Sequence, residues 1–276
     1  MPDQSTAIFC YRQFTIIWHN VSTNKFQIRG FSDMRTVLVV LFVVLFLVLT
    51  IPVMLVEWVI GKFNQDLKDR SSLRIVQWAF RCVLFLSGTR ITVIGEENVP
   101  KDEPVLYIGN HRSYFDVVIT YARTPGLCGY ISKKEIDRIP LLNIWMRYLH
   151  CLFLDRENIK EGLAMILSAI NKVKSGISIC VFPEGTRNNS GEDFLPFRSG
   201  SLKIAEKSGC AIVPMALNNT EDIFEAHVPW IHKAHIILEY CKPIYPKDFP
   251  KEERKNLPEL VEKTVKETYY KNLHLI

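Results

Sequence analysis

The chain has 276 residues, 48% of them hydrophobic, and a formal net charge of +5, which allows one large domain with appendages. Its 7 cysteines form no CxxC pair and no framework spacing, which excludes a disulfide scaffold and favours reduced thiols facing the cytosol. The modest positive charge suits an anionic membrane surface or an anionic substrate, and we expect no nucleic-acid partner.

The N-terminal part is expected to hold a membrane-associated segment. Residues 1–35 are an extension of uncertain structure, either interfacial or preceding a true start at Met34. The run Val37 to Val56 has 20 residues without charge, enough to cross a bilayer core, and an amphipathic stretch follows at Leu73 to Leu86. Cations flank the run about equally, so a helical hairpin dipping into one leaflet fits at least as well as a single crossing. Residues 36–88 are assigned to these membrane-associated helices, with a buried core helix as the alternative.

Residues 89–276 alternate short runs of β-forming residues with helical patterns. This order predicts an α/β domain, in which flanking helices cover a layered parallel or mixed sheet. The candidate strands are Arg90–Ile94, Val105–Ile108, Gly129–Ser132, Cys151–Asp155, Ile177–Phe182, Ala211–Leu217 and His235–Tyr240. The candidate helices are Ser113–Ala122, Leu141–Tyr148, Ile159–Val173, Gly200–Lys207 and Leu257–Asn272.

The stretch VLYIGNHRSYFD, at residues 105–116, places a histidine on a strand-to-helix turn. Ser113 is a favourable helix N-cap, and Asp116 follows three residues later, as in a capping box. His111 lies on the turn between strand and helix, where it can reach solvent and substrate. A nearby carboxylate can orient the imidazole and stabilise its protonated form, so His111 and Asp116 are the predicted general base and orienting acid. The alternative is that Asp116 only caps the helix.

The same spacing occurs between His150 and Asp155 in the segment LHCLFLD. This segment looks like a strand, and residues five apart on a strand face opposite ways. We therefore expect His150 to have no part in the chemistry.

A second motif, ISICVFPEGTR at residues 177–187, puts polar residues at the end of another buried strand. Pro183 ends the strand and Gly185 permits a tight backbone turn. Glu184, Thr186 and Arg187 then lie at the strand's carboxyl end, where open α/β sheets bind ligands. Arg187 can hold a phosphate in a bidentate manner, and Glu184 can accept from a hydroxyl or hold Arg187. A purely structural Glu–Arg pair is the alternative.

Taken together, NHRSYFD and FPEGTR resemble the motifs of the glycerolipid acyltransferases, specifically the bacterial 1-acyl-glycerol-3-phosphate acyltransferase group. Weaker matches at Phe153–Arg156 and Ile212–Met215 extend the resemblance to about residues 70–245. Two departures leave the acceptor headgroup open. His150 stands where the family often has Gly, and Arg198-Ser199-Gly200 replaces Lys-Lys-Gly.

The resemblance implies transfer of an acyl group from an acyl thioester to the free hydroxyl of 1-acyl-glycerol-3-phosphate, giving phosphatidic acid. His111 would be the base, and Arg156, Arg187 and Glu184, with Gly185 and Thr186, would bind the acceptor. Backbone N–H groups near Gly185 are candidates for the oxyanion. Acyl-coenzyme A or acyl carrier protein would be the co-substrate, with no cofactor and no metal. The expected location is the membrane, on the cytoplasmic face of a bacterial inner membrane.

Other classes of protein fit the motifs less well. A serine hydrolase would need a G-x-S-x-G turn, which is absent from the sequence. A metalloenzyme built on His227, His232, His235 and Cys241 would have no strong zinc spacing. An acyltransferase for another lysolipid and a non-enzymatic membrane lipid-binding protein remain the alternatives, and the presence of both motifs argues against the second.

Overall fold

The computed structural model describes residues 30–155, 158–188, 190 and 194–276. Within them the strands form one seven-stranded sheet in the order β1-β7-β6-β2-β5-β3-β4. Neighbouring strands are parallel except β6 and β7, which are antiparallel. The bounds are β1 Arg90–Ile94, β2 Val105–Gly109, β3 Cys128–Lys133, β4 Leu152–Leu154, β5 Ser178–Val181, β6 Ala211–Asn218 and β7 His235–Tyr240. The predicted α/β class is confirmed, and every expected strand is present.

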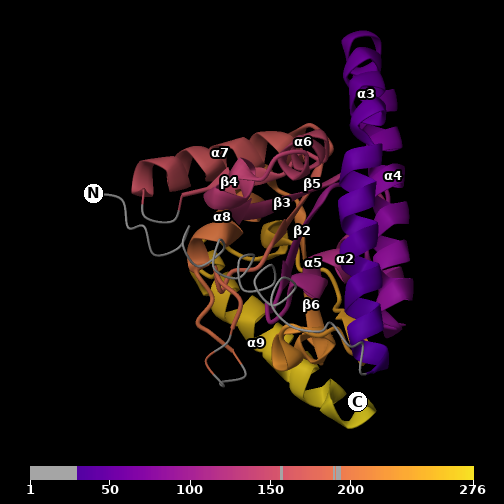
Figure 1. Ribbon diagram of the computed structural model, residues 1–276. Coiled ribbons are helices and arrows are strands. Elements are labelled where there is room, and N and C mark those ends of the chain that lie inside the picture. The colour runs from indigo at the N-terminus through magenta and orange to yellow at the C-terminus, as the bar shows by residue number, and fades with distance from the viewer. Residues whose placement is uncertain (1–29, 156–157, 189, 191–193) are drawn as a thin grey trace.

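Helices cover both faces of this sheet (Figure 1). The central strands β2 and β6 are buried along their whole length, so their apolar side chains alternate between two cores. Val105 and Tyr107 face the core shared with α4, α5 and α6, whereas Leu106 and Ile108 face the core shared with α7, α8 and α9. The bounds of these helices are α4 Gln65–Ser87, α5 Tyr114–Tyr121, α6 Leu142–Tyr148, α7 Ile159–Lys174, α8 Lys203–Ser208 and α9 Leu257–Asn272.

Two N-terminal helices, α2 (Phe31–Leu49) and α3 (Ile51–Phe63), lie along α4 and form a helical hairpin with it (Figure 1). The single helix expected over Val37 to Val56 is broken at Thr50. Pro52 lies in the first turn of the second helix, and its ring nitrogen has no N–H to continue the hydrogen bonds of the first helix. Among the described residues no single helix is long and apolar enough to cross a membrane. The bent pair Asp33–Leu49 and Ile51–Phe63, with 47° between its parts, meets that requirement by length and composition.

Two other expectations need correction. The helix expected from Gly200 begins as a 3-10 turn, Ser199–Leu202, before α8. His150 does not lie in a strand: it follows α6 with a positive φ of 60°, and β4 begins two residues later. The apolar pattern of Leu152–Leu154 does not extend back to His150, because the chain first turns sharply out of α6.

Candidate active site

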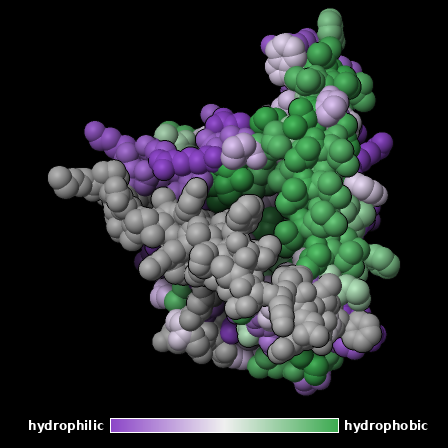
Figure 2. All heavy atoms as spheres, in the orientation of Figure 1, coloured by the Kyte–Doolittle hydropathy of each residue, from purple (hydrophilic) through white to green (hydrophobic). Residues whose placement is uncertain are grey.

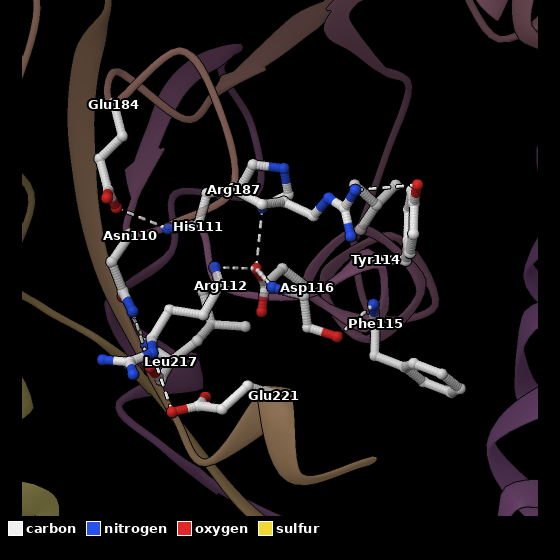
Figure 3. A network of polar contacts seen from close by, with 12 residues as sticks. Asn110, His111, Arg112, Tyr114, Phe115, Asp116, Glu184, Arg187, Leu217 and Glu221 are labelled. Carbon is white, nitrogen blue, oxygen red and sulfur yellow. Dashed lines mark hydrogen bonds and ion pairs between the residues drawn. The ribbon is translucent and has the colours of Figure 1, made fainter. Parts of the chain in front are cut away.

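The two motifs, residues 105–116 and 177–187, meet at the carboxyl ends of the central strands. Strands β2, β5 and β6 are parallel neighbours, so the loops after their carboxyl ends leave on the same side. Asn110, fully buried, fixes the first loop to β6. Its amide donates to the Leu217 carbonyl at 2.8 Å, and its oxygen accepts from the Leu217 N–H at 2.9 Å. This pair holds the turn that carries His111 (Figure 3).

Asp116 joins the histidine to the start of α5. One of its carboxylate oxygens, Oδ2, accepts from His111 Nδ1 at 2.8 Å and from the backbone N–H groups of Arg112 and Ser113, both at 2.7 Å. The residue is fully buried, whereas the His111 side chain is 17% exposed. The same Asp116 oxygen atom therefore both caps α5 and contacts the imidazole of His111. Because a carboxylate only accepts, His111 Nδ1 carries the proton and Nε2 is left as a base.

The imidazole of His111 is also held from its face. It stacks on the ring of Phe182, with centroids 4.4 Å apart and 14° between the planes. Phe182 directly follows β5, so the second motif supports the first by packing as well as by hydrogen bonding.

Glu184 contacts the loop between β2 and α5 that carries His111, here called the histidine loop. Its side chain is buried, and its two oxygens accept from the backbone N–H of His111 at 2.7 Å and of Leu195 at 3.0 Å. Burial raises the pKa of Glu184, and the two backbone donors oppose that shift. Glu184 thus ties the β5 loop to the histidine loop (Figure 3). The Gly185 N–H donates to the Phe182 carbonyl at 3.0 Å, so this candidate oxyanion donor is already engaged.

Arg187 points toward the start of α5. Its guanidinium lies 3.6 Å from the Tyr114 ring centre, with Nη2 donating to the Tyr114 hydroxyl at 2.9 Å. Its Nη1 donates to Glu225 at 3.1 Å. Gly185 has a φ of +76°, and a Cβ there would lie 3.2 Å from the Arg198 guanidinium, so only glycine suits this turn. Thr186 is exposed, and the predicted Arg156 lies outside the described residues.

Sequence reasoning missed two carboxylates that hold the histidine loop from the segment after β6. Glu221, in the 3-10 turn Thr220–Ile223, lies 2.8 Å from the Arg112 Nε. Glu225, in the turn Glu225–His227, accepts from Ser113 Oγ at 2.6 Å and from the Tyr114 N–H at 2.9 Å. The acidic character of this segment was visible in the sequence, but its partners more than a hundred residues away were not.

Two further histidines that the structure describes pair with carboxylates other than Asp116. His150 Nε2 is 2.8 Å from Asp69 on α4, and Lys172 on α7 is 3.4 Å from its other ring nitrogen. His227 pairs with Asp222 at 2.8 Å and stacks on His232. Over the part of the chain that the structure describes, no group of three or more His, Cys, Asp or Glu residues could hold a metal ion.

Known proteins share this sequence pattern and this fold. Residues 90–218 match the family described as Acyltransferase. A 1-acyl-sn-glycerol-3-phosphate acyltransferase of Borreliella burgdorferi is 36% identical over 160 residues, which cover 56% of this chain and 62% of that protein, less than two thirds of its length. One of Helicobacter pylori is 33% identical over 67% of this chain and 78% of its own length. The crystal structure of the 1-acyl-sn-glycerophosphate acyltransferase PlsC of Thermotoga maritima superposes with a TM-score of 0.75. It is 26% identical and is matched over 87% of this chain and 95% of its own.

Proposed function

The chain belongs to the Acyltransferase family, and we propose that it transfers a fatty acyl group from an acyl thioester to the free hydroxyl of 1-acyl-glycerol-3-phosphate, making phosphatidic acid. The observation that carries this proposal is the 2.8 Å contact between His111 Nδ1 and the buried Asp116, which leaves Nε2 as a base. The names of the relatives support the choice of substrate.

The chemistry needs one base and no covalent enzyme intermediate. His111 Nε2 accepts the proton of the acceptor hydroxyl, and that oxygen attacks the thioester carbonyl. The carbon–sulfur bond then breaks, and the leaving thiolate takes the proton from the imidazolium. Asp116 stabilises the imidazolium between these steps. Ser113 is not a nucleophile in this scheme, because its hydroxyl donates to Glu225 at 2.6 Å and accepts from the Phe115 N–H at 3.0 Å.

We assign the acceptor phosphate to Arg187, whose planar fork suits a phosphate. Arg187 contacts Tyr114 at the start of α5, three residues beyond His111. Binding the phosphate there would bring the acceptor hydroxyl toward the base, and such positioning accounts for much of the rate gain. Glu184 would act on the acceptor indirectly, by holding the loop that carries His111. Arg156 remains a predicted second phosphate ligand.

The lipid substrates would arrive from a membrane that meets α2 and α3. Figure 2 shows a continuous apolar surface over these two helices. Large side chains there are strongly exposed, including Leu49 at 69%, Leu55 at 63% and Phe63 at 88%. The surface of a soluble monomeric protein rarely carries an apolar patch of this extent, and such patches mark contact with a membrane or a partner. We propose that the protein lies on the cytoplasmic face of a bacterial inner membrane. Acyl-coenzyme A or acyl carrier protein would be the acyl donor, and the reaction would need no cofactor.

The test is acyl transfer by the purified full chain in lipid vesicles. Both donor types are offered with lysophospholipids that carry a phosphate, ethanolamine or choline headgroup. We expect phosphatidic acid from 1-acyl-glycerol-3-phosphate with at least one donor. Transfer only to another headgroup would favour the alternative acceptor, and no transfer at all would favour a lipid-binding protein without activity.

A further inference from the structure

Glu225 connects the two motifs that carry the site. Its side chain is 9% exposed. Oxygen Oε1 accepts from Arg187 Nη1 at 3.1 Å and from the Tyr114 N–H at 2.9 Å, and Oε2 accepts from Ser113 Oγ at 2.6 Å. This one carboxylate, which is partly buried, therefore contacts both the first turn of α5 and the arginine of the second motif.

These contacts hold Arg187 in place before any ligand binds. Glu225 takes one N–H of the guanidinium and the Tyr114 hydroxyl takes another, while the Tyr114 ring covers the face at 3.6 Å. A guanidinium has five N–H groups, so these two hydrogen bonds do not exhaust its capacity to bind a ligand. An arginine side chain otherwise loses much rotational freedom on binding, and a fixed fork avoids that loss.

We propose that Glu225 is a positioning residue that presents Arg187 to the phosphate of the acyl acceptor. The inference rests on the proposed function, because it assumes that Arg187 binds a phosphate. Glu225 acts through Arg187 and does not itself touch substrate. Its anchors on the start of α5 keep it in place when the phosphate arrives, so the ion pair orients the arginine rather than competing for it.

Glutamine is the informative substitution at this position. Its side chain is the same size as that of Glu225 and has one oxygen to accept from the Tyr114 N–H and one amide to donate to the Ser113 hydroxyl, so the start of α5 keeps its partners. What Glu225→Gln removes is the charge that holds Arg187. Glu221→Gln is the matched control, because Glu221 lies four residues earlier on the same segment and pairs with Arg112 at 2.8 Å instead.

The experiment is a double-mutant cycle on the full chain in vesicles, with KM for 1-acyl-glycerol-3-phosphate, KM for the acyl donor and kcat measured in each variant. We expect Glu225→Gln to raise the acceptor KM by about 10-fold to 100-fold, as expected for a misplaced binding group, with the donor KM unchanged. In an Arg187→Gln background the same change should have little further effect, whereas Glu221→Gln should act independently of Arg187.

The kinetic constants of the variants separate a failure of this inference from a failure of the proposed function. The inference is overturned if the effects of Glu225→Gln and Arg187→Gln on the acceptor KM multiply, or if a folded Glu225→Gln protein has an unchanged acceptor KM. In both cases turnover by the wild-type protein leaves the proposed function intact. Absence of wild-type turnover overturns the proposed function and this inference with it. If Glu225→Gln does not fold, Glu225→Asp keeps the charge on a shorter side chain and should give a smaller rise in acceptor KM, with an unchanged KM again counting against the inference.

Discussion

Replacing Asp116 by Asn separates its electrostatic role from its structural role. The Asp116 oxygen Oδ2 accepts three hydrogen bonds, two of them from backbone N–H groups. Those two donors require an oxygen at this position. The side-chain amide of the introduced Asn would therefore be oriented with its oxygen toward the two N–H groups and His111. The Nδ1 proton of His111 therefore keeps its acceptor, and all three hydrogen bonds survive the loss of the charge.

The size of the effect follows from this count of hydrogen bonds. A bond to a charged group contributes about 1.5–3 kcal/mol and a neutral one about 0.5–1.5 kcal/mol, so each of the three loses about 1 kcal/mol. We expect Asp116→Asn to lower the free energy of unfolding by about 3 kcal/mol. Turnover should fall by about 10²-fold through lost stabilisation of the imidazolium, less than where such a change also reverses the tautomer.

The assay is kcat with both substrates saturating, together with thermal and urea unfolding. Asp222→Asn is the control, because Asp222 also contacts a histidine five residues away, His227 at 2.8 Å, but is 43% exposed. An exposed pair contributes about 0.2–1 kcal/mol, so the control should change little. If Asp116→Asn lowers stability while turnover stays at the wild-type value, Asp116 only caps the helix and the reasoning is refuted.

Three further predictions concern other parts of the molecule. Arg187→Lys should raise the acceptor KM without changing the donor KM, because an ammonium group cannot reproduce the planar fork; the reverse pattern would assign this arginine to the donor. Replacing the exposed Trp58 and Phe63 by Glu should reduce partition into vesicles by about tenfold or more, and undiminished binding would exclude α3 as a membrane contact. Burial lowers the pKa of His150 from 6.5, although Asp69 opposes the shift, so the folded protein binds fewer protons than the unfolded chain below about pH 6.5. Stability should fall as pH falls through that range, and His150→Gln should reduce this dependence in thermal melts; an equal dependence in both proteins would refute it.

What could be predicted from the sequence is what depends on neighbouring residues. The strand Val105–Gly109 and the pair His111 and Asp116 lie within twelve residues, so apolar runs and capping chemistry sufficed to find them. Residues that contact Glu225, Glu221 and His150 lie 38 to 112 residues away in the sequence. No periodicity of the sequence reveals contacts between such distant residues. Glu184 is predicted to bind the acceptor from its place in the motif. No pattern in the sequence shows that its two oxygens also accept from the backbone N–H groups of His111 and Leu195.

The role of His111 as the base of acyl transfer to 1-acyl-glycerol-3-phosphate is open to one direct measurement. It compares phosphatidic acid formation by His111→Ala and His150→Gln, both verified as folded by thermal melts. Loss of a general base costs about 10² to 10⁴ in rate, so His111→Ala should be nearly inactive. His150 pairs with Asp69 away from the site and should be dispensable for turnover. An active His111→Ala protein, or an inactive His150→Gln protein, would contradict the account.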